Sequence, residues 1–461
     1  MVNVPPYGKH AYVIPVFKKG QSSRVENYRP ISLTCVLCKF FESVIKLDLS
    51  EYLAQNNILN DAQHGFLSRH STCTNLLESI NDWSLNIKNG HHSRIIFIDF
   101  AKAFDTVCHS KLLYKMSRLG IDGKLLRMLS SYLNCRTQQV LLDGALSDTK
   151  RVISGVPQGS VLGPLFFLIY INDFVEVLPK TIISKLFADD AKLYTEMEGD
   201  LDADYLQTGL DNLCKWAKKW QLKISYNKCF SMDVGLKRTQ QPYPDHSIDG
   251  VLLSSVNECR DLGVIVDNKL HFTTHISEMV AKSKQRMALL FRTFIVKDPV
   301  HLVRGFKSYV LPLIDYCSQV WSPHRAKDIL LIESVQRKFT KRIPGLKNLS
   351  YAERLSRLEL TTLERRRLNF DLSMCYKILH GFVSGPPEKY GLILSSRMSR
   401  GHSLKLTVEH CKVDSRKFYF SNRVCHPWNS LPDSIVSANN VKTFNNNLKS
   451  INLDKFLTIK P

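Results

Sequence analysis

Three aspartates stand where the sequence predicts the ends of β-strands. The apolar strand 94–98 ends on Asp99, and residues 182–194 form a predicted hairpin with Asp189 and Asp190 at its tip. Adjacent carboxylates repel each other and are not buried without a compensating cation. Because carboxylate oxygens are ligands for hard divalent ions, this pattern predicts a site that holds two metal ions.

Five stretches of the chain carry motifs in an order typical of one protein family. The most specific is the string from Ser154 to Pro164, which reads Ser-Gly-Val-Pro-Gln-Gly-Ser-Val-Leu-Gly-Pro. The other stretches are residues 14–20 with 27–33, 97–105, 187–190 and 222–228. On these motifs the chain resembles the reverse transcriptases of non-LTR retrotransposons, of the LINE or jockey-like kind.

The resemblance implies an α+β fold of the right-hand polymerase type. We expect fingers and a palm with an antiparallel sheet over residues 1–264, and a helical thumb over residues 265–345. A mainly helical C-terminal region of unknown function is expected over residues 346–461. Full elements of this family carry an endonuclease domain before the polymerase, and this chain begins almost at the fingers. Self-sufficient integration is therefore not expected.

The activity that the resemblance implies is RNA-directed DNA synthesis. The partners would be an RNA template, a DNA primer and dNTPs, and the cofactor two Mg²⁺ ions, with Mn²⁺ as an alternative. The resemblance assigns the metal ions to Asp99, Asp189 and Asp190, and makes Lys228 a candidate proton donor to the leaving pyrophosphate. A merely solvated lysine is an equally weighted alternative. A group II intron maturase, a telomerase relative and an inactive nucleic-acid-binding copy are the rival interpretations.

Four residues are expected to bind the incoming nucleotide. Lys19 and Arg29 flank the bend of a predicted strand-loop-strand and are candidate phosphate contacts, although a surface hairpin with ordinary lysines fits the same pattern. The resemblance places Phe104 at the steric-gate position, where a bulky ring excludes a ribose 2′-hydroxyl; outside the motif, a core phenylalanine would be preferred. Gln158 is expected to contact the nucleotide or the template base.

The charge balance indicates a polyanionic partner. Lys and Arg number 63 against 42 Asp and Glu, which gives a net charge of +21. Lys282 and Arg286 lie off the apolar face of a predicted helix and are expected to contact a nucleic-acid backbone, the alternative being a solvated helix face. The resemblance places Gly263 in a primer-grip strand, residues 260–264.

Two predicted helices frame these motifs. Residues 31–56 carry apolar side chains at helical spacing that are expected to pack, namely Val36, Phe40, Phe41, Val44, Ile45, Leu49 and Leu53. Residues 165–174 are apolar on almost every side and are expected to be buried. The resemblance places the stretch Gln63 to Phe66, between these helices, near the template strand.

The chain shows no feature of a secreted or membrane protein. Its 12 cysteines are scattered as expected for free thiols in a reducing compartment, the N-terminus lacks an apolar signal segment, and the longest apolar run, 161–171, is too short to span a bilayer. We expect a soluble intracellular protein, in the nucleus or the cytoplasm.

Overall fold

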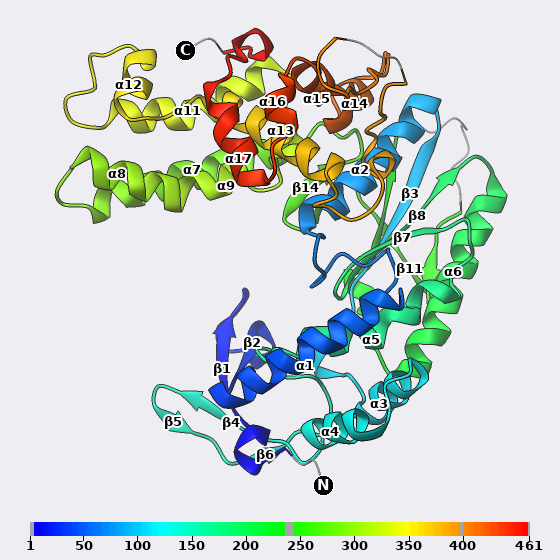
Figure 1. The fold of residues 1–461 in the computed structure, drawn as a ribbon. Coiled ribbons are helices and arrows are strands. Elements are labelled where there is room, and N and C mark those ends of the chain that lie inside the picture. Colours follow the sequence, from blue (N-terminus) through cyan, green and yellow to red (C-terminus); the bar gives the residue numbers. More distant parts are fainter. Residues whose placement is uncertain (1–3, 236–243, 397–399, 460–461) are drawn as a thin grey trace. The chain divides into compact units, whose positions relative to one another are not determined.

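The computed structural model describes residues 4–235, 244–396 and 400–459 (Figure 1). The chain forms two compact units. The first unit comprises Met1–Ser68, Ile95–Ser231 and Pro242–Ser255, and the second comprises Arg69–Arg94, Met232–Gln241 and Val256–Pro461. Each unit combines sequence segments that lie far apart along the chain. The three-part division at residues 264 and 345 stays a prediction.

A sheet in the order β2-β1-β4-β5 follows the N-terminus, and β6 pairs with β4 as well. Its strands are β1 (His10–Phe17), β2 (Tyr28–Thr34), β4 (Thr137–Leu142), β5 (Ala145–Leu146) and β6 (Lys150–Arg151). β1 runs antiparallel to β2 and parallel to β4. The predicted strand-loop-strand at the N-terminus is therefore present, with the last pair, Phe17 and Tyr28, closing the bend.

A second sheet, in the order β12-β9-β3-β8-β7, carries the aspartates. Its strands are β3 (His92–Ile98), β7 (Ile183–Phe187), β8 (Asp190–Met197), β9 (Phe230–Val234) and β12 (Ser254–Ser255). β3 is buried along almost its whole length, which explains why its sequence is an uninterrupted apolar run rather than an alternating one. β7 and β8 form the predicted antiparallel hairpin, whereas β12 pairs with β9 in parallel, so the sheet is mixed.

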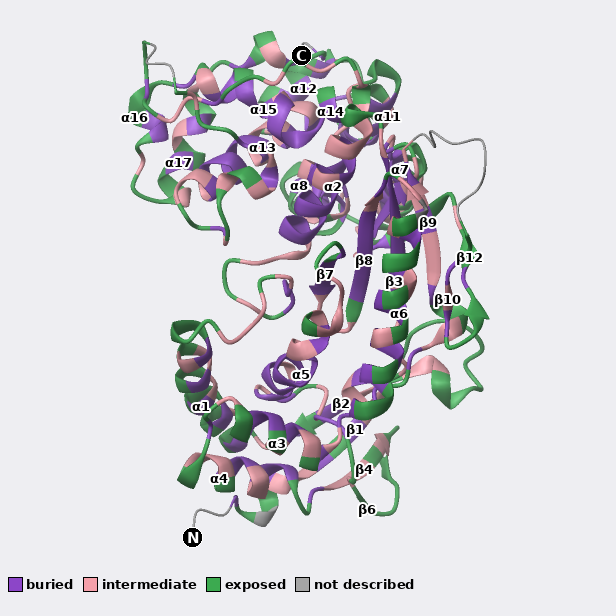
Figure 2. Cartoon of the chain, turned by 90° about the vertical axis from the view of Figure 1, so that its right-hand side faces the viewer, coloured by how far each residue is buried: buried purple, intermediate pink, exposed green. Residues whose placement is uncertain are grey.

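Helices surround these sheets in the first unit. They are α1 (Val36–Gln55), α3 (His109–Arg118), α4 (Gly123–Leu133), α5 (Gly163–Ile171) and α6 (Asp200–Trp220), with a short hairpin of β10 (Ser247–Ile248) and β11 (Val251–Leu252). Apart from Pro164, every residue of α5 is buried, as predicted (Figure 2). α3 packs against both α4 and α5, and α6 packs against β8. Together these elements confirm the α+β fold class.

The prediction for α1 is confirmed for three of its packing side chains and wrong for four. Ile45, Leu49 and Leu53 are buried, together with Cys38. Phe40 is 74% exposed, and Val36, Phe41 and Val44 are exposed as well. The sequence of α1 is apolar on two sides, and only one of them can face a core; periodicity alone does not say which.

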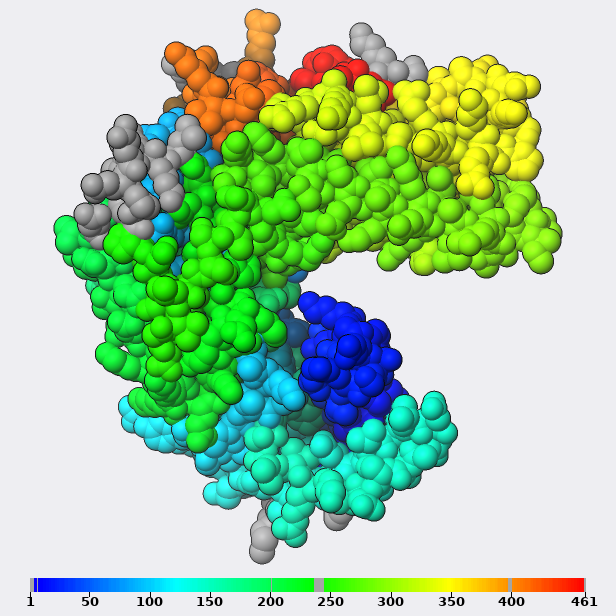
Figure 3. All heavy atoms as spheres, turned by 180° about the vertical axis from the view of Figure 1, so that it is seen from behind, coloured from blue at the N-terminus to red at the C-terminus, as the bar shows by residue number. Residues whose placement is uncertain are grey.

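The second unit is mainly helical. Its helices are α2 (Thr72–Asn89), α7 (Thr273–Thr293), α8 (Pro299–Gly305), α9 (Leu311–Asp315), α10 (Ser318–Trp321), α11 (Ala326–Lys341), α12 (Tyr351–Arg357), α13 (Leu363–Leu379), α14 (Asp414–Lys417), α15 (Phe420–Asn429), α16 (Asp433–Val436) and α17 (Val441–Asn447), with a π-helical turn at Phe306–Val310. α7 and α11 pack side by side, and their surfaces adjoin in Figure 3. α2 packs against α10 and α14, so an early helix completes a largely C-terminal core.

A two-stranded hairpin belongs to the same unit. It consists of β13 (Glu258–Asp261) and β14 (Val264–Asp267), which pair in antiparallel fashion. Among the helices of the described ranges, none combines the length and the apolar character that crossing a bilayer requires.

Candidate active site

Asp99 is the first residue after β3. The loop that contains Ser225 and Cys229 holds its backbone. The Ser225 N–H donates to the Asp99 carbonyl at 2.8 Å, and the Asp99 N–H donates to the Cys229 sulfur at 3.5 Å. Burial raises the pKa of the Cys229 thiol to about 11, so it stays neutral at this position. The Asp99 side chain remains 36% exposed. The loop therefore fixes the backbone and leaves the carboxylate accessible.

Asp189 occupies the tip of the β7–β8 hairpin, as predicted. Phe187 pairs with Asp190, so the turn consists of Ala188 and Asp189 alone. Ala188 has a φ of +58°, a left-handed conformation that a two-residue hairpin loop favours but that an L-residue other than glycine rarely adopts. Asp189 is half-buried, whereas Asp190 is exposed at the start of β8. The two adjacent carboxylates thus lie in different environments, one half-buried and the other exposed to solvent.

Asp99 and Asp189 influence each other electrostatically, and Asp189 lies in the turn before β8, the strand next to β3. Burial raises the pKa of Asp189, and the nearby Asp99 carboxylate raises it further, while Lys18 and Arg29 lower it. The Lys228 ammonium group lies 3.0 Å from an Asp99 carboxylate oxygen. The two strand ends therefore carry carboxylates that feel each other's charge, with Lys228 paired to Asp99 and with Lys18 and Arg29 favouring the ionised form of Asp189.

The donor set at this position fits divalent metal ions. The ligand atoms are carboxylate oxygens, which Mg²⁺ and Mn²⁺ prefer. The raised pKa of Asp189 indicates that its ionised form is disfavoured by burial and by Asp99, and a bound cation reverses both effects. Asp99, Asp189 and the adjacent Asp190 are the residues that could hold such ions.

The cationic bend between β1 and β2 carries both predicted phosphate contacts, Lys19 and Arg29, and a third cation, Lys18. Lys18 and Arg29 lower the pKa of Asp189. The roles of Lys19 and Arg29 as phosphate contacts stay predictions. The Lys18 N–H donates to the Asn27 carbonyl at 2.8 Å, which places Lys18 at the base of the bend. All three side chains are exposed at a position suited to a phosphate.

Phe104 lies in a 3-10 turn, Ala103–Asp105, just beyond Asp99. Its ring stacks on Phe167 of α5, with centroids 4.4 Å apart and planes 18° apart, and meets the edge of Phe66 at 6.2 Å. The side chain is half-buried. A ring supported from behind by α5 is rigid enough to act as a steric barrier, which is the role that the sequence predicted for it.

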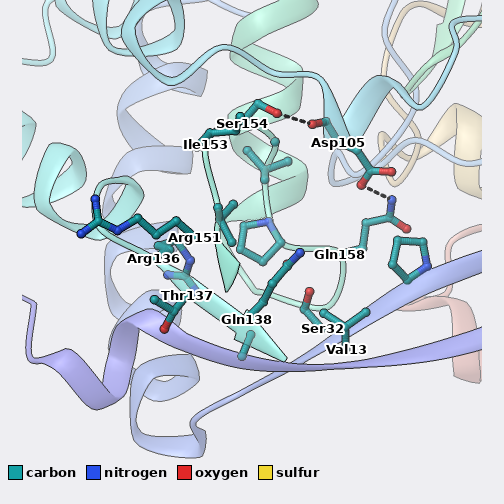
Figure 4. A pocket seen from close by; sticks show the side chains of 16 residues that line it. Val13, Ser32, Asp105, Arg136, Thr137, Gln138, Arg151, Ile153, Ser154 and Gln158 are labelled. Carbon is teal, nitrogen blue, oxygen red and sulfur yellow. Dashed lines mark hydrogen bonds between the residues drawn. The ribbon is translucent and has the colours of Figure 1, made fainter. Parts of the chain in front are cut away.

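Gln158 is hydrogen-bonded to Asp105. Its amide Nε2 donates to an Asp105 carboxylate oxygen at 2.8 Å, and the Ser154 hydroxyl donates to the Asp105 carbonyl (Figure 4). Gly155 has a φ of +85°, and a Cβ there would lie 2.7 Å from the Asp105 carbonyl oxygen. A side chain at residue 155 would therefore separate the motif string from the Asp105 turn.

A cavity of about 270 Å³ opens beside this string. Its lining is mixed: apolar residues such as Val13 and Ile153 lie beside Arg136, Arg151 and Gln158 (Figure 4). Asp105, which Gln158 binds, lines the same cavity, so the motif string and the Asp105 turn border it together.

The predicted nucleic-acid contacts belong to the second unit. Gly263 turns the β13–β14 hairpin with a φ of +89°. On α7, the Lys282 ammonium lies 3.0 Å from a Glu278 carboxylate oxygen, and Arg286 donates to the Tyr309 carbonyl at 3.0 Å. The Arg286 guanidinium also stacks on the Tyr309 ring at 4.8 Å. Their role as nucleic-acid contacts stays a prediction.

The sequence analysis missed what Gln63 and Gly65 contact. Both residues lie against the Ala188 turn of the first unit, 125 residues from Gln63 in the sequence. The expectation that the stretch Gln63 to Phe66 lies near the template strand stays a prediction. The available signal was a short polar stretch with a glycine between two helices, which identifies a loop and says nothing about its partner.

Comparisons with known proteins show the family of the chain. The reverse transcriptase (RNA-dependent DNA polymerase) family profile matches residues 16–266. The RNA-directed DNA polymerase from mobile element jockey of Drosophila melanogaster is 30% identical over 352 residues, which cover 74% of this chain and 38% of that protein. The probable RNA-directed DNA polymerase from the X-element transposon of the same fly is 27% identical over 74% of this chain and 38% of its own length.

This chain thus spans well under half the length of these curated relatives. Among solved structures, apo telomerase from Candida tropicalis aligns with a TM-score of 0.45 and 12% identity, over 83% of this chain and 63% of that one.

Proposed function

Because this chain belongs to the reverse transcriptase family and is jockey-like, as its motifs predicted, we propose that it is an RNA-directed DNA polymerase of a non-LTR element. In this proposal it adds dNTPs to the 3′-hydroxyl of a DNA primer, as directed by an RNA template. The observation that carries the proposal is the placement of Asp99 directly after β3 and of Asp189 in the turn before β8, the neighbouring strand.

The proposed cofactor is a pair of Mg²⁺ ions, with Mn²⁺ as an alternative, held by Asp99, Asp189 and Asp190. When bound, these ions would lower the pKa of the primer hydroxyl and neutralise charge on the triphosphate. The chain's own contribution is positional, because β3 and the β7–β8 turn hold the carboxylates on rigid elements.

The cations of the first unit have distinct proposed tasks. Lys18, Arg29 and the adjacent Lys19 would bind the triphosphate, since fixed cations stabilise the charge that develops during phosphoryl transfer. Lys228 would move from its ion pair with Asp99 toward the leaving pyrophosphate and donate a proton to it. An exposed ammonium group has the rotational freedom to serve both partners.

Substrate selection is assigned to two side chains. The Phe104 ring, supported by Phe167, would exclude a 2′-hydroxyl and so select dNTPs over rNTPs. Gln158, which is oriented by Asp105, would contact the nucleotide or the template base. In the second unit, Gly263, Lys282 and Arg286 are proposed to hold the primer–template backbone.

Primer extension tests this proposal. We expect the chain to extend a DNA primer on an RNA template with dNTPs and Mg²⁺, and Asp189→Ala to abolish extension. Asp204→Ala, which removes an exposed carboxylate from α6, is the matched control and should retain activity. A wild-type chain that binds primer–template in low salt and never extends the primer would contradict the proposal and indicate a binding protein.

A further inference from the structure

Ala188 directly precedes the catalytic Asp189. The hydrogen-bond partner of its backbone N–H is a side chain from outside the β7–β8 hairpin. Ala188 is buried, and its N–H donates to the Gln63 side-chain oxygen at 2.8 Å. The same oxygen accepts the Gly65 N–H at 2.7 Å. Because both neighbours are N–H donors, the amide orientation of Gln63 is determined by its surroundings. The Gln63 Nε2 completes the clamp by donating to the Ala188 carbonyl at 3.4 Å.

The backbone around Gln63 is anchored to the strand that leads into the turn. The His64 N–H donates to the Leu186 carbonyl and the Leu186 N–H to the Ala62 carbonyl, each at 2.8 Å, so Gln63 forms a parallel bridge with Leu186. Gln63 itself is only 4% exposed. A buried amide fixed at its backbone is a stiff support for whatever it binds.

Two features of the turn explain why such a support is needed. Ala188 adopts a φ of +58°, which an L-residue holds only when its surroundings impose it. Gly65 packs so closely that a Cβ there would lie 2.4 Å from the Ala188 nitrogen. The turn is therefore held by hydrogen bonds from Gln63 and confined by the bare backbone of Gly65.

We propose that Gln63 is a positioning residue that holds Asp189 in its reactive orientation through the two backbone groups of Ala188. The inference rests on the proposed polymerase function. The same segment continues into Phe66, whose ring meets the Phe104 gate edge-on. Residues 63–66 thus connect the carboxylate turn with the ring that borders the nucleotide, although they contribute no carboxylate or cation to either.

The test replaces Gln63 by a side chain of similar size that cannot hydrogen-bond. Gln63→Met should lower the single-turnover rate of nucleotide addition on primed RNA roughly 10- to 100-fold, the range expected when reacting groups are misplaced by about 1 Å. The dNTP concentration for half-maximal rate and the primer–template Kd should stay near wild type, because Gln63 touches neither ligand in this account. The matched control is Gln336→Met in α11, which removes a similarly buried amide bonded to the Thr361 carbonyl at 2.8 Å.

The outcomes separate positioning from general destabilisation. We expect both variants to lose thermal stability, and only Gln63→Met to lose rate. Equal rates in the two variants at equal folded fractions would overturn the inference. If Gln63→Met does not fold, Gly65→Ala displaces the same turn while keeping the glutamine, and a folded Gly65→Ala with a wild-type rate would overturn the inference equally. An inactive wild type would instead refute the proposed polymerase function.

Discussion

Two of the two-residue hairpins in the described part of the chain, β13–β14 and β7–β8, reach that geometry by different means. In the β13–β14 turn both residues, Leu262 and Gly263, have positive φ, and the second is the glycine that such turns favour. In the β7–β8 turn an alanine takes the left-handed position and Asp189 follows it. The β13–β14 turn therefore has a glycine at one of its two positions, whereas the β7–β8 turn has no glycine at either.

The anchors of the two turns differ as well. Gln63 binds both backbone groups of Ala188, whereas the Tyr316 hydroxyl donates to the Leu262 carbonyl at 2.7 Å and its ring covers Gly263. The comparison teaches that a functional turn need not have a favourable turn sequence. A residue chosen for chemistry, such as Asp189, can be placed on a strained turn if another segment supports the strain.

The largest expected effect concerns β14, the second strand of the β13–β14 hairpin. The Ile265 N–H of β14 donates to His275 Nδ1 at 3.3 Å, and burial lowers the pKa of His275 from 6.5 to about 4, with Arg260 lowering it too. As the pH falls, His275 therefore takes up a proton at a higher pH in the unfolded state than in the folded state. Stability should fall as pH drops through 6.5 and level off near 4, by about 3 kcal/mol, since one pKa unit corresponds to about 1.4 kcal/mol.

Urea unfolding across this pH range measures the effect. The pH slope between 6.5 and 4 should flatten in His275→Gln. The charges facing the ring are Arg260, Lys282 and Glu278, and the first two oppose its protonation. A slope that is the same in wild type and His275→Gln would show that the pKa of the histidine is the same in the folded and unfolded states and that β14 is not anchored in this way.

Removing the glycine of the β13–β14 turn should have the next largest effect. Gly263→Ala places a Cβ about 3.2 Å from the Tyr316 ring at a φ of +89°. We expect a loss of about 1–3 kcal/mol in the free energy of unfolding. Thermal or urea unfolding of the purified variant measures it, and primer–template affinity should fall more than the nucleotide-addition rate. Wild-type stability would show that the local turn sequence is not what holds this hairpin.

Removing the hydroxyl that caps the same turn should cost less. Tyr316→Phe loses the bond to the Leu262 carbonyl and keeps the ring against Gly263. The expected loss is about 1 kcal/mol, the net value of one hydrogen bond. A double-mutant cycle with Gly263→Ala reports whether the ring and the hydroxyl act together, and strict additivity would argue against a shared anchor.

The smallest effect has the opposite sign and concerns the catalytic turn. Ala188→Gly relieves the left-handed strain at φ +58°, and the greater freedom of glycine in the unfolded chain offsets part of that gain. We expect a change between zero and about 1 kcal/mol in favour of the folded state. A clear loss of stability in urea unfolding would mean that the Ala188 methyl group, rather than Gln63, is what secures the turn.

The carboxylates could be predicted from the sequence because their placement is local. Asp99 ends an apolar strand and Asp189 tips a hairpin, and both positions follow from runs of neighbouring residues. The Gln63 clamp could not, because its partner lies 125 residues away and only the fold brings them together. The same limit applies to α1, where the spacing of Phe40 was read correctly as helical and its exposure was not.

A finer limit concerns the cations of the β1–β2 bend. Lys18 and Lys19 both lie beyond the end of β1, and the sequence does not tell which of two adjacent loop lysines lies nearer to Asp189. The burial of α5, by contrast, could be predicted without knowing which face of the helix meets the core. Its sequence is apolar on every side, so no error of register could expose it.

The most direct test of the account asks whether Asp99 and Asp189 share one metal site. Mn²⁺ binding to the full chain with primer–template and dNTP is measured by electron paramagnetic resonance, in wild type, Asp99→Asn, Asp189→Asn and the surface control Asp204→Asn. The account predicts tight Mn²⁺ binding in wild type and the control, and a marked loss in either of the other variants. Unchanged Mn²⁺ binding in both Asp99→Asn and Asp189→Asn would contradict the claim that these strand ends form the catalytic metal site.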